Sequence, residues 1–264
     1  VAAFIDYTKR AVELGQDEIV TMTPAGINII DLAGKAVAPN EYTITWDSAA
    51  AQKGGYTHFM LKEIFEQPKA VADTLIGRLS DNGKIELDEL HMSDAEIKAL
   101  KKIVVIACGT AYHAGMIAKY VIEKWAKISV EVEIASEYRY RDPIIDANTL
   151  VIAISQSGET MDTLMAIRHA KAAGARVLAI CNTNSSTIPR ESDAVLYTHA
   201  GPEIAVASTK ALLTQIVAVD LIGLHLAQVR GELNDEQVHD LYNEMLELPG
   251  KIEQILETVE PLRA

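Results

Sequence analysis

The sequence has little of three features that define common protein classes. Only two cysteines, Cys108 and Cys181, occur in 264 residues. Two are too few for a disulfide scaffold, and this usage is typical of a reducing compartment such as the cytoplasm. No run approaches the roughly 20 uninterrupted apolar residues of a membrane helix. The first ten residues also lack the basic and apolar regions of a signal peptide. We therefore expect a cytoplasmic chain with no membrane contact.

Clustered positive charge is also missing. The chain has 24 Lys and Arg against 37 Asp and Glu, for a formal net charge of −13. Such a field repels nucleic acid, so we expect no nucleic-acid partner. Residues 231–264 alone carry nine acids against two bases, which we interpret as the solvated face of helices. An apolar content of 49% with 23% charged residues indicates a globular protein.

The first 46 residues are rich in short β-type runs. The runs at 18–23 and 27–31 are separated by Pro24 and Gly26, and Gly34 follows the second run, a pattern that predicts a three-stranded antiparallel meander. Three short strands without a thick core are not stable alone, so we expect this part to be the end of a larger domain or a flap packed on the main one. The small residues of 47–56, with Gly54 and Gly55 paired, predict a linker.

From residue 57 to 230 the pattern is that of one α/β domain. Apolar residues recur at helical spacing over 57–80, where Pro68 predicts a break near Gln67. Short apolar runs then alternate with helical segments, which predicts strands at 102–107, 130–135, 149–155, 175–181 and 193–198 and helices at 111–127, 159–173 and 208–230. We predict a flavodoxin-like, doubly wound, five-stranded parallel sheet. Residues 231–264 predict an acidic helical connection.

In a sheet of this kind, ligands bind beyond the carboxyl ends of the strands, where the strand order reverses. For the order 2-1-3-4-5 this point lies between the first and third strands. The loops to inspect are therefore ACGTAYHAG (107–115) and SQSGET (155–160).

The SQSGET loop is the more informative of the two. Three hydroxyl groups fall within six residues, and Gly158 allows close approach of the backbone to a ligand. The helix that follows directs free N–H groups and its positive end at this loop, which suits a phosphate without any lysine. The alternative is simple capping, with Ser157 as N-cap and Glu159 as a first-turn acid. Capping leaves Ser155, Gln156 and Thr160 unexplained.

The remaining loops predict less. Thr110 could donate to the same ligand, whereas Cys108 reads as a small core residue at a strand end. Neither a Walker A loop nor GxGxxG occurs, and the seven histidines form no metal-binding pattern, so we expect no cofactor and no metal. Ser208 and Thr209 could cap the next helix, and Lys210 could be a solvated helix residue. Glu203 is a carboxylate on the expected ligand side.

Five segments in this order closely resemble the sugar isomerase (SIS) family. They are IACGTAYHAG, EIASEYRYRDP, LVIAISQSGETMDTL, LAICNTNSSTIPRESD and GPEIAVASTKA. EIASEYRYR and EIAVASTKA resemble more narrowly the isomerase half of the glutamine–fructose-6-phosphate aminotransferases, or glucosamine-6-phosphate synthases. YTHFMLKEIFEQP (56–68) is similar to the opening of that half, and the β-rich start is similar to the end of their glutaminase domain.

The resemblance implies a role in converting fructose 6-phosphate and glutamine to glucosamine 6-phosphate and glutamate. It implies that residues 57–230 are the first of two SIS domains and hold the sugar phosphate. The implied substrate-binding positions are Thr110, Ala111, Ser155, Gln156, Ser157, Thr160 and Val206, the last by its backbone. Many relatives have serine where this chain has Ala111, which removes one hydrogen bond worth about 0.5–1.5 kcal/mol. A homodimer is also expected.

The resemblance also implies that catalytic groups are missing. The family's glutaminase uses an N-terminal cysteine, whereas this sequence begins with Val1. The ring-opening lysine, the proton-moving glutamate and a histidine are expected beyond residue 264. Among the carboxylates, Glu159 and Glu137 read as structural, and Glu203 is a candidate for an indirect role behind the substrate contacts. We therefore expect these 264 residues alone to be inactive.

Two other functions are compatible with parts of the pattern. A non-catalytic SIS module that senses sugar phosphates would use the same loop, but such sensors usually accompany a basic DNA-binding domain, which the first 100 residues do not suggest. An FMN-binding flavodoxin would need aromatic residues beside the flavin, and the loops offer only Tyr112 and Tyr138.

Overall fold

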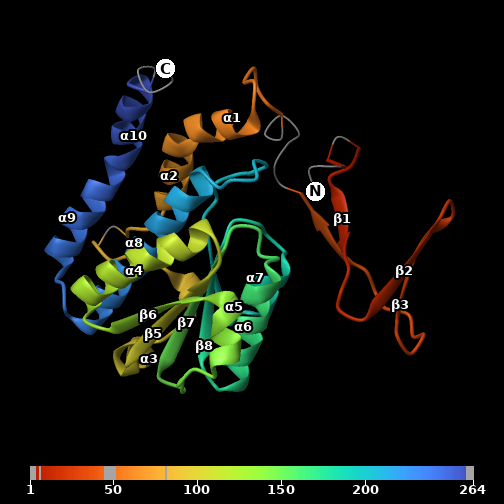
Figure 1. Cartoon of the computed structure of the whole chain (residues 1–264), viewed down its shortest axis with the longest axis horizontal. Helices are drawn as coiled ribbons and strands as arrows, with labels where there is room; N and C mark the ends of the chain where they lie inside the picture. The colour runs from red at the N-terminus through yellow and green to blue at the C-terminus, as the bar shows by residue number, and fades with distance from the viewer. Residues whose placement is uncertain (1–3, 6, 45–51, 81, 260–264) are drawn as a thin grey trace. The chain divides into compact units, whose positions relative to one another are not determined.

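The computed structural model describes all residues except 1–3, 6, 45–51, 81 and 260–264. The chain divides into two compact units, Val1–Gly54 and Gly55–Ala264 (Figure 1). Residues 47–51 of the predicted linker lie outside the described residues.

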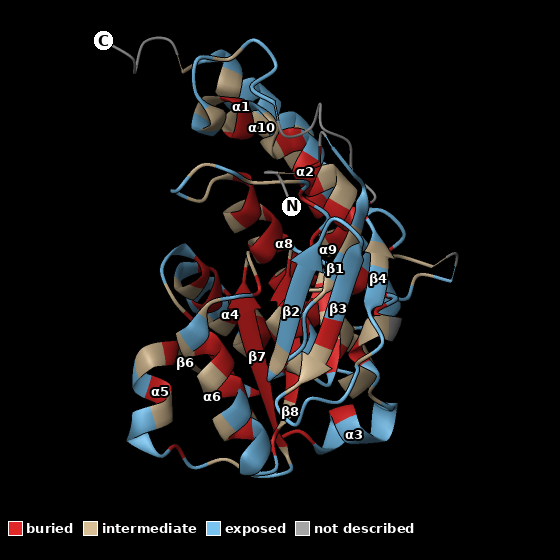
Figure 2. Cartoon of the chain, turned by 90° about the vertical axis from the view of Figure 1, so that its right-hand side faces the viewer, coloured by how far each residue is buried: buried red, intermediate tan, exposed pale blue. Residues whose placement is uncertain are grey.

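The N-terminal unit contains two antiparallel strand pairs rather than the predicted three-stranded meander. Its strands are β1 (Arg10–Glu13), β2 (Glu18–Thr23), β3 (Gly26–Asp31) and β4 (Asn40–Thr43). β2 pairs with β3 as a hairpin, whereas β4 pairs with β1, with Arg10 opposite Thr43. The pairing of β1 with β4 joins segments about 30 residues apart, a contact that local periodicity does not reveal. β2 is largely exposed (Figure 2).

The second unit is built on the predicted five-stranded parallel sheet. Its strands are β5 (Lys102–Ala107), β6 (Ser129–Ile134), β7 (Thr149–Ser155), β8 (Arg176–Cys181) and β9 (Ala194–Tyr197). They lie in the order β6-β5-β7-β8-β9, and all four neighbouring pairs are parallel. This is the 2-1-3-4-5 order, so the predicted fold class is confirmed.

Both faces of this sheet are buried, which explains why its strands are apolar without alternation. Along β5, Ile103 and Val105 belong to one core and Val104 and Ile106 to the other. All residues of β7 are buried, as Figure 2 shows. Successive side chains of a strand point to opposite faces, so each central strand contributes to two cores at once.

Helices form the outer layers. α4 (Thr110–Ala126) and α8 (Lys210–Arg230) cover one face, and α5 (Ala135–Arg141), α6 (Met161–Ala172) and α7 (Thr187–Glu191) cover the other (Figure 1). A short 3₁₀ turn, η2 (Asp88–Leu90), and α3 (Asp94–Ala99) precede β5. α3 begins with a capping box between Ser93 and Glu96.

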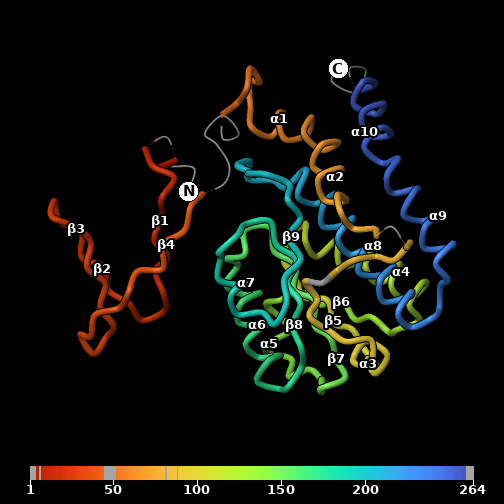
Figure 3. The backbone as a smooth tube through the Cα atoms, turned by 180° about the vertical axis from the view of Figure 1, so that it is seen from behind, coloured from red at the N-terminus to blue at the C-terminus, as the bar shows by residue number. Residues whose placement is uncertain are grey.

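Helices from the two ends of this unit pack together. α1 (Phe59–Phe65) and α2 (Gln67–Leu75) meet at Glu66, with Pro68 in the first turn of α2, close to the predicted break. α9 (Asp235–Leu246) and α10 (Leu248–Glu257) form the helical tail, and α10 packs on α2 (Figure 3). The buried hydroxyl of Tyr242 donates to the carbonyl of Leu75 at 2.7 Å.

α8 is long and apolar enough, by length and composition, to cross a membrane, although it contains no uninterrupted apolar run of that length. Most of it is buried in this unit, where it packs against α4 and α2. A core helix of a globular domain passes the same test of length and composition.

Candidate functional site

The reversal of strand order brings two loops together. β5 lies between β6 and β7, and Ala107 at its end pairs in register with Ile154 of β7. The loop after β5 leads into α4 at Thr110, and the loop after β7 leads into α6 at Met161. Two helix N-termini with free N–H groups therefore start at the same edge of the sheet.

The loop after β7 is held by its own hydroxyl groups. The Ser155 hydroxyl accepts the N–H of Gly158 at 3.1 Å and lies 3.2 Å from the hydroxyl oxygen of Thr160. The Ser157 hydroxyl accepts the N–H of Glu159 at 3.2 Å. Gly158 has a φ of +68°, a conformation that glycine adopts without strain.

This geometry corrects the capping alternative. The N-cap of α6 is Thr160, so Ser157 lies three residues before the cap and outside the helix. Glu159 is not in the first helical turn either; its carboxylate accepts the N–H of Thr187, at the start of α7, at 2.8 Å. Gly158, with its positive φ, adds a turn of the loop between Ser157 and the helix start. Residue preferences for the N-cap position alone do not predict this turn.

A pocket of about 150 Å³ opens between the two loops. Six of the seven predicted substrate positions line it: Thr110, Ala111, Ser155, Gln156, Ser157 and Thr160. Three further residues that were not predicted as substrate positions also line it: Cys108, Ile154 and Gln215. Val206 is not among the lining residues and is fully exposed.

The chemistry of this pocket is that of neutral donors. No charged side chain is among the described residues that line it; hydroxyl and amide groups make up its polar surface. Hydroxyls, amides and helix N-termini together can bind an anion without a cationic side chain. Pockets that enclose whole small molecules usually measure about 300–1,000 Å³, so this one suits one end of a larger ligand.

The cysteines differ from each other. Cys108 is partly buried; it packs against the core at the end of β5, as predicted, and it also lines the pocket. Cys181, at the end of β8, is buried, and burial raises the pKa of its thiol to about 12. The Cys181 thiol therefore stays protonated near neutral pH and is not a thiolate nucleophile.

The loop before α8 is tied down by carboxylates. Glu203 accepts the N–H groups of Thr209 at 2.9 Å and Ala211 at 3.2 Å, and it also accepts the hydroxyl of Ser208 at 3.1 Å. Thr209 is the N-cap of α8 by position, but its side chain makes no capping bond. Glu203 therefore caps the helix in place of Ser208 and Thr209, because the loop folds back on the helix start.

Helix α1 anchors the same loop from the other side. The buried carboxylate of Glu63 accepts the N–H of Ile204 at 2.6 Å and that of Ala205 at 3.2 Å. Lys210 is only 3% exposed and pairs with Glu66 at 2.7 Å. Lys210 is thus a buried ion-pair partner, which corrects its interpretation as a solvated residue.

No proton-transfer base is found at the pocket within the described part of the chain. Glu159, Glu203 and Glu137 are all absent from its lining, and Glu137 is exposed on α5. No group of three His, Cys, Asp or Glu among the described residues is placed to hold a metal ion. Three larger open hollows of about 330, 320 and 340 Å³ share no lining residue with this pocket.

Comparison with known proteins agrees with this architecture. Residues 96–224 match the SIS domain family. The C-terminal domain of glucosamine-fructose-6-phosphate aminotransferase from Francisella tularensis has a similar structure, with a TM-score of 0.70 and 46% identity over 75% of this chain and 55% of that one. A putative phosphosugar isomerase from Silicibacter pomeroyi is similar at a TM-score of 0.57 and 26% identity over 74% and 55% of the two chains.

Sequence similarity extends over the whole of this chain, beyond the residues that match the SIS family. The chain is 58% identical over 263 residues to the glutamine–fructose-6-phosphate aminotransferase of Streptomyces coelicolor, covering 100% of this chain and 43% of the relative. It is 56% identical to that of Corynebacterium diphtheriae, covering 98% of this chain and 42% of the relative. The expected resemblance is therefore confirmed, and the chain spans less than half the length of these relatives.

Proposed function

We propose that this chain is the sugar-phosphate-binding part of a glutamine–fructose-6-phosphate aminotransferase. In this proposal the pocket between β5 and β7 holds the phosphate of fructose 6-phosphate or glucosamine 6-phosphate. The observation that carries it is the convergence of Thr110, Ser155, Gln156, Ser157 and Thr160 on one pocket without a lining carboxylate. The similarity to aminotransferases over the whole chain supports the choice of substrate.

The pocket suits a phosphate for an electrostatic reason. A chain with a net charge of −13 repels anions at long range, so a bound phosphate must gain its stability from short-range donors. A hydrogen bond to a charged acceptor contributes about 1.5–3 kcal/mol, so three or four hydroxyl donors offset this repulsion. The N-termini of α4 and α6 add N–H groups and the positive ends of their dipoles.

Catalysis would need groups that this pocket lacks. Moving a proton between C1 and C2 of a sugar requires a base within hydrogen-bond reach of both carbons. No carboxylate or histidine lines the described pocket. We therefore propose that these 264 residues bind the substrate and that isomerisation and amino transfer need groups supplied from elsewhere. Residues 1–46 would be the end of a glutaminase domain.

Several properties of the assembly belong to the same proposal. We propose a cytoplasmic homodimer that contacts neither nucleic acid nor membrane. The free cysteines support a reducing compartment, and the net charge of −13 argues against a nucleic-acid partner. Light scattering at several concentrations tests the dimer: a mass of twice 28.7 kDa supports it, and 28.7 kDa throughout contradicts it.

Calorimetric titration tests the binding role. Fructose 6-phosphate, glucosamine 6-phosphate, inorganic phosphate and FMN are titrated into the chain and into a Ser155→Ala/Thr160→Ala variant. Binding of the sugar phosphates that the double variant loses supports the proposal. FMN binding with no sugar-phosphate binding would overturn it in favour of a flavodoxin.

The sensing alternative is tested by activity. The chain is joined to the C-terminal part that its aminotransferase relatives possess, and glucosamine 6-phosphate formation is measured with ammonia. Product formation supports the enzyme, whereas tight sugar-phosphate binding without turnover would favour a sensing module.

A further inference from the structure

One residue that lines the pocket, Gln215, comes from helix α8 and not from the two loops, and no role has been given to it so far. Gln215 lies in the second turn of α8 and lines the pocket beside the loops of β5 and β7. Only 2% of its surface is exposed. Its side chain makes no hydrogen bond to any residue that the structure describes, and its Oε1 atom is fully buried without a partner.

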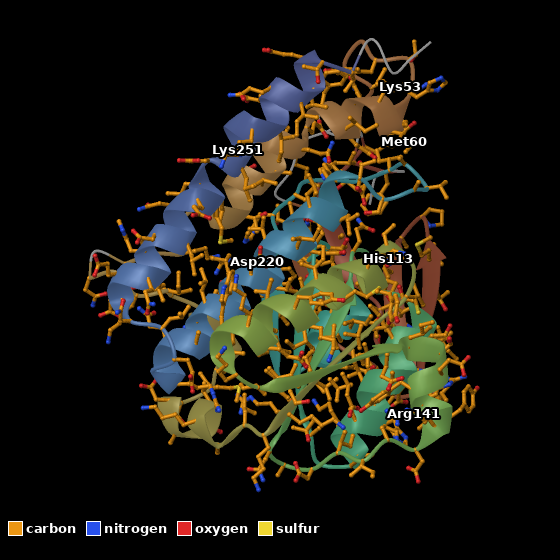
Figure 4. All side chains as sticks on the ribbon, turned by 60° about the vertical axis from the view of Figure 1, so that its left-hand side comes forward. Lys53, Met60, His113, Arg141, Asp220 and Lys251 are labelled. Atoms are coloured by element: carbon orange, nitrogen blue, oxygen red, sulfur yellow. The ribbon has the colours of Figure 1, made fainter. Side chains whose placement is uncertain are left out.

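Of the two polar atoms of this amide, Oε1 is the fully buried one, whereas Nε2 is not among the buried unpartnered atoms, so Nε2 is the end left to meet a ligand in the pocket. Other polar side chains of α8 show the ordinary pattern. Thr214 donates to the carbonyl of Ala211, and the Gln228 amide accepts the N–H of Ile85 and donates to Gly83. Asp220 also has an unpartnered oxygen, but it lies further along the helix and does not line the pocket (Figure 4). Gln215 alone among these combines the missing partner with a position on the pocket.

We propose that Gln215 is a further ligand-binding residue, whose side-chain amide donates a hydrogen bond to a phosphate oxygen of the bound sugar phosphate. This inference rests on the proposed function. A phosphate dianion has lone pairs but no hydrogen to donate, so only the amide nitrogen can bond to it. The pocket is also small enough that its lining residues meet the phosphate end of the ligand.

This contact would give the pocket a third wall. The two loops belong to strands adjacent in the sheet, whereas α8 follows β9 and reaches the pocket from the helical layer. A donor on that side bonds to an oxygen that hydroxyls of the β7 loop do not face. Because Gln215 is neutral, it adds a donor without the desolvation cost of a buried lysine.

Substitution of Gln215 separates donation from simple packing. Gln215→Glu keeps the shape, removes the donor and adds a negative charge; Gln215→Met keeps the length and removes the polarity. We expect Gln215→Met to weaken inorganic phosphate and fructose 6-phosphate binding three- to tenfold, and Gln215→Glu to weaken both by more than tenfold. Gln228→Glu, on the same helix but away from the pocket, is the matched control and should change affinity less than twofold.

A spectroscopic readout distinguishes contact from fold. Thermal unfolding first confirms that each variant is folded; if Gln215→Glu is not, Gln215→Met decides. In the unaltered chain labelled with ¹⁵N, addition of inorganic phosphate should shift the side-chain amide signals of Gln215, identified by their loss in Gln215→Met. A residue that only packs the core would show no such shift.

The outcomes separate this inference from the proposed function. Phosphate binding unchanged in both Gln215 variants, but lost in Ser155→Ala/Thr160→Ala, would overturn the inference and leave the proposed function standing. Weaker fructose 6-phosphate binding with unchanged inorganic phosphate binding would assign the amide to a sugar hydroxyl and overturn the contact proposed here. Absence of binding to the unaltered chain would overturn both.

Discussion

The conformation of Gly158 allows a quantitative test of how the phosphate loop is built. Replacing this glycine by alanine would place a Cβ atom 1.9 Å from the hydroxyl oxygen of Ser186 and 2.8 Å from its Cβ. Pro189 Cδ would lie 3.1 Å away. Gly158 also has positive φ, and its carbonyl accepts the N–H of Ile188 at 2.9 Å. The loop is thus pressed against the start of α7 with no room for a side chain.

The cost has two parts that can be estimated separately. A non-glycine residue in the left-handed region costs about 1–2 kcal/mol. Overpacking costs about 1–3 kcal/mol, because Ser186 must move and weaken its hydrogen bond to the carbonyl of Thr183. We therefore expect Gly158→Ala to lower the free energy of unfolding by about 2–5 kcal/mol and to weaken phosphate binding.

A double-mutant cycle with Ser186→Gly isolates the steric part. This second change removes the two closest atoms, and glycine is accepted at the N-cap position that Ser186 occupies in α7. In that background Gly158→Ala should cost only about 1–2 kcal/mol, the backbone part. The difference is a coupling energy of about 1–3 kcal/mol.

Urea unfolding of the four proteins, followed by circular dichroism, measures the cycle. Phosphate titration of the folded proteins then shows whether the loop regains its function in the double variant. An equal cost of Gly158→Ala in both backgrounds would refute the reasoning, because it would mean that Ser186 does not limit the space at Gly158.

Three further predictions concern buried polar groups. Burial raises the pKa of Asp220 to about 7, so the folded chain favours the protonated acid and loses stability as the pH rises from about 4 to 7. Asp220→Asn should therefore raise the free energy of unfolding by about 2–4 kcal/mol at pH 8 and hardly change it at pH 4. Thermal unfolding at the two pH values measures this, with Asp240→Asn, at an exposed position, as the control. An equal gain in stability at both pH values would contradict the prediction. Glu63→Gln keeps one acceptor oxygen but removes its charge, so the hydrogen bonds to the loop at 204–205 should weaken by about 1–1.5 kcal/mol and amide hydrogen exchange there should become faster; unchanged exchange would argue against the anchor. Tyr242→Phe should cost about 1–3 kcal/mol in urea unfolding, because it leaves the buried carbonyl of Leu75 without its donor, and no loss would mean that water replaces the hydroxyl.

Local pattern was sufficient for the sheet because each buried strand is a continuous apolar run. Helices cover both faces, so every side chain of β7 is buried, and the sequence at 149–155 is accordingly an almost continuous apolar run. The switch point then follows from strand order, and the residue types alone single out the hydroxyl-rich loop at 155–160. Identification of the sugar phosphate as ligand came instead from resemblance, because hydroxyl donors suit many anions.

The predictions from local sequence that were wrong have a common cause, which is a contact with a part of the chain that local pattern does not include. The α6 cap was predicted at Ser157, but the chain turns left-handed at Gly158 and the loop bonds to the start of α7, about 30 positions later, so the helix begins after Thr160. The pairing of β1 with β4 was missed for the same reason. Ser208 and Thr209 look like helix caps, but a folded-back carboxylate, Glu203, takes that role.

The class of fold, the place of the pocket and most of its hydroxyl groups follow from the amino-acid sequence, because they depend on periodicity and on residues adjacent in the chain. The position of Gln215 on the same pocket follows only from the packing of the helices on the sheet, since α8 comes after the last strand and begins 50 residues after the loop at 155–160 ends. The same packing lets Glu63 hold the loop of Ile204 from a helix about 140 residues earlier. Contacts between distant segments depend on how layers pack, and no local pattern encodes that packing.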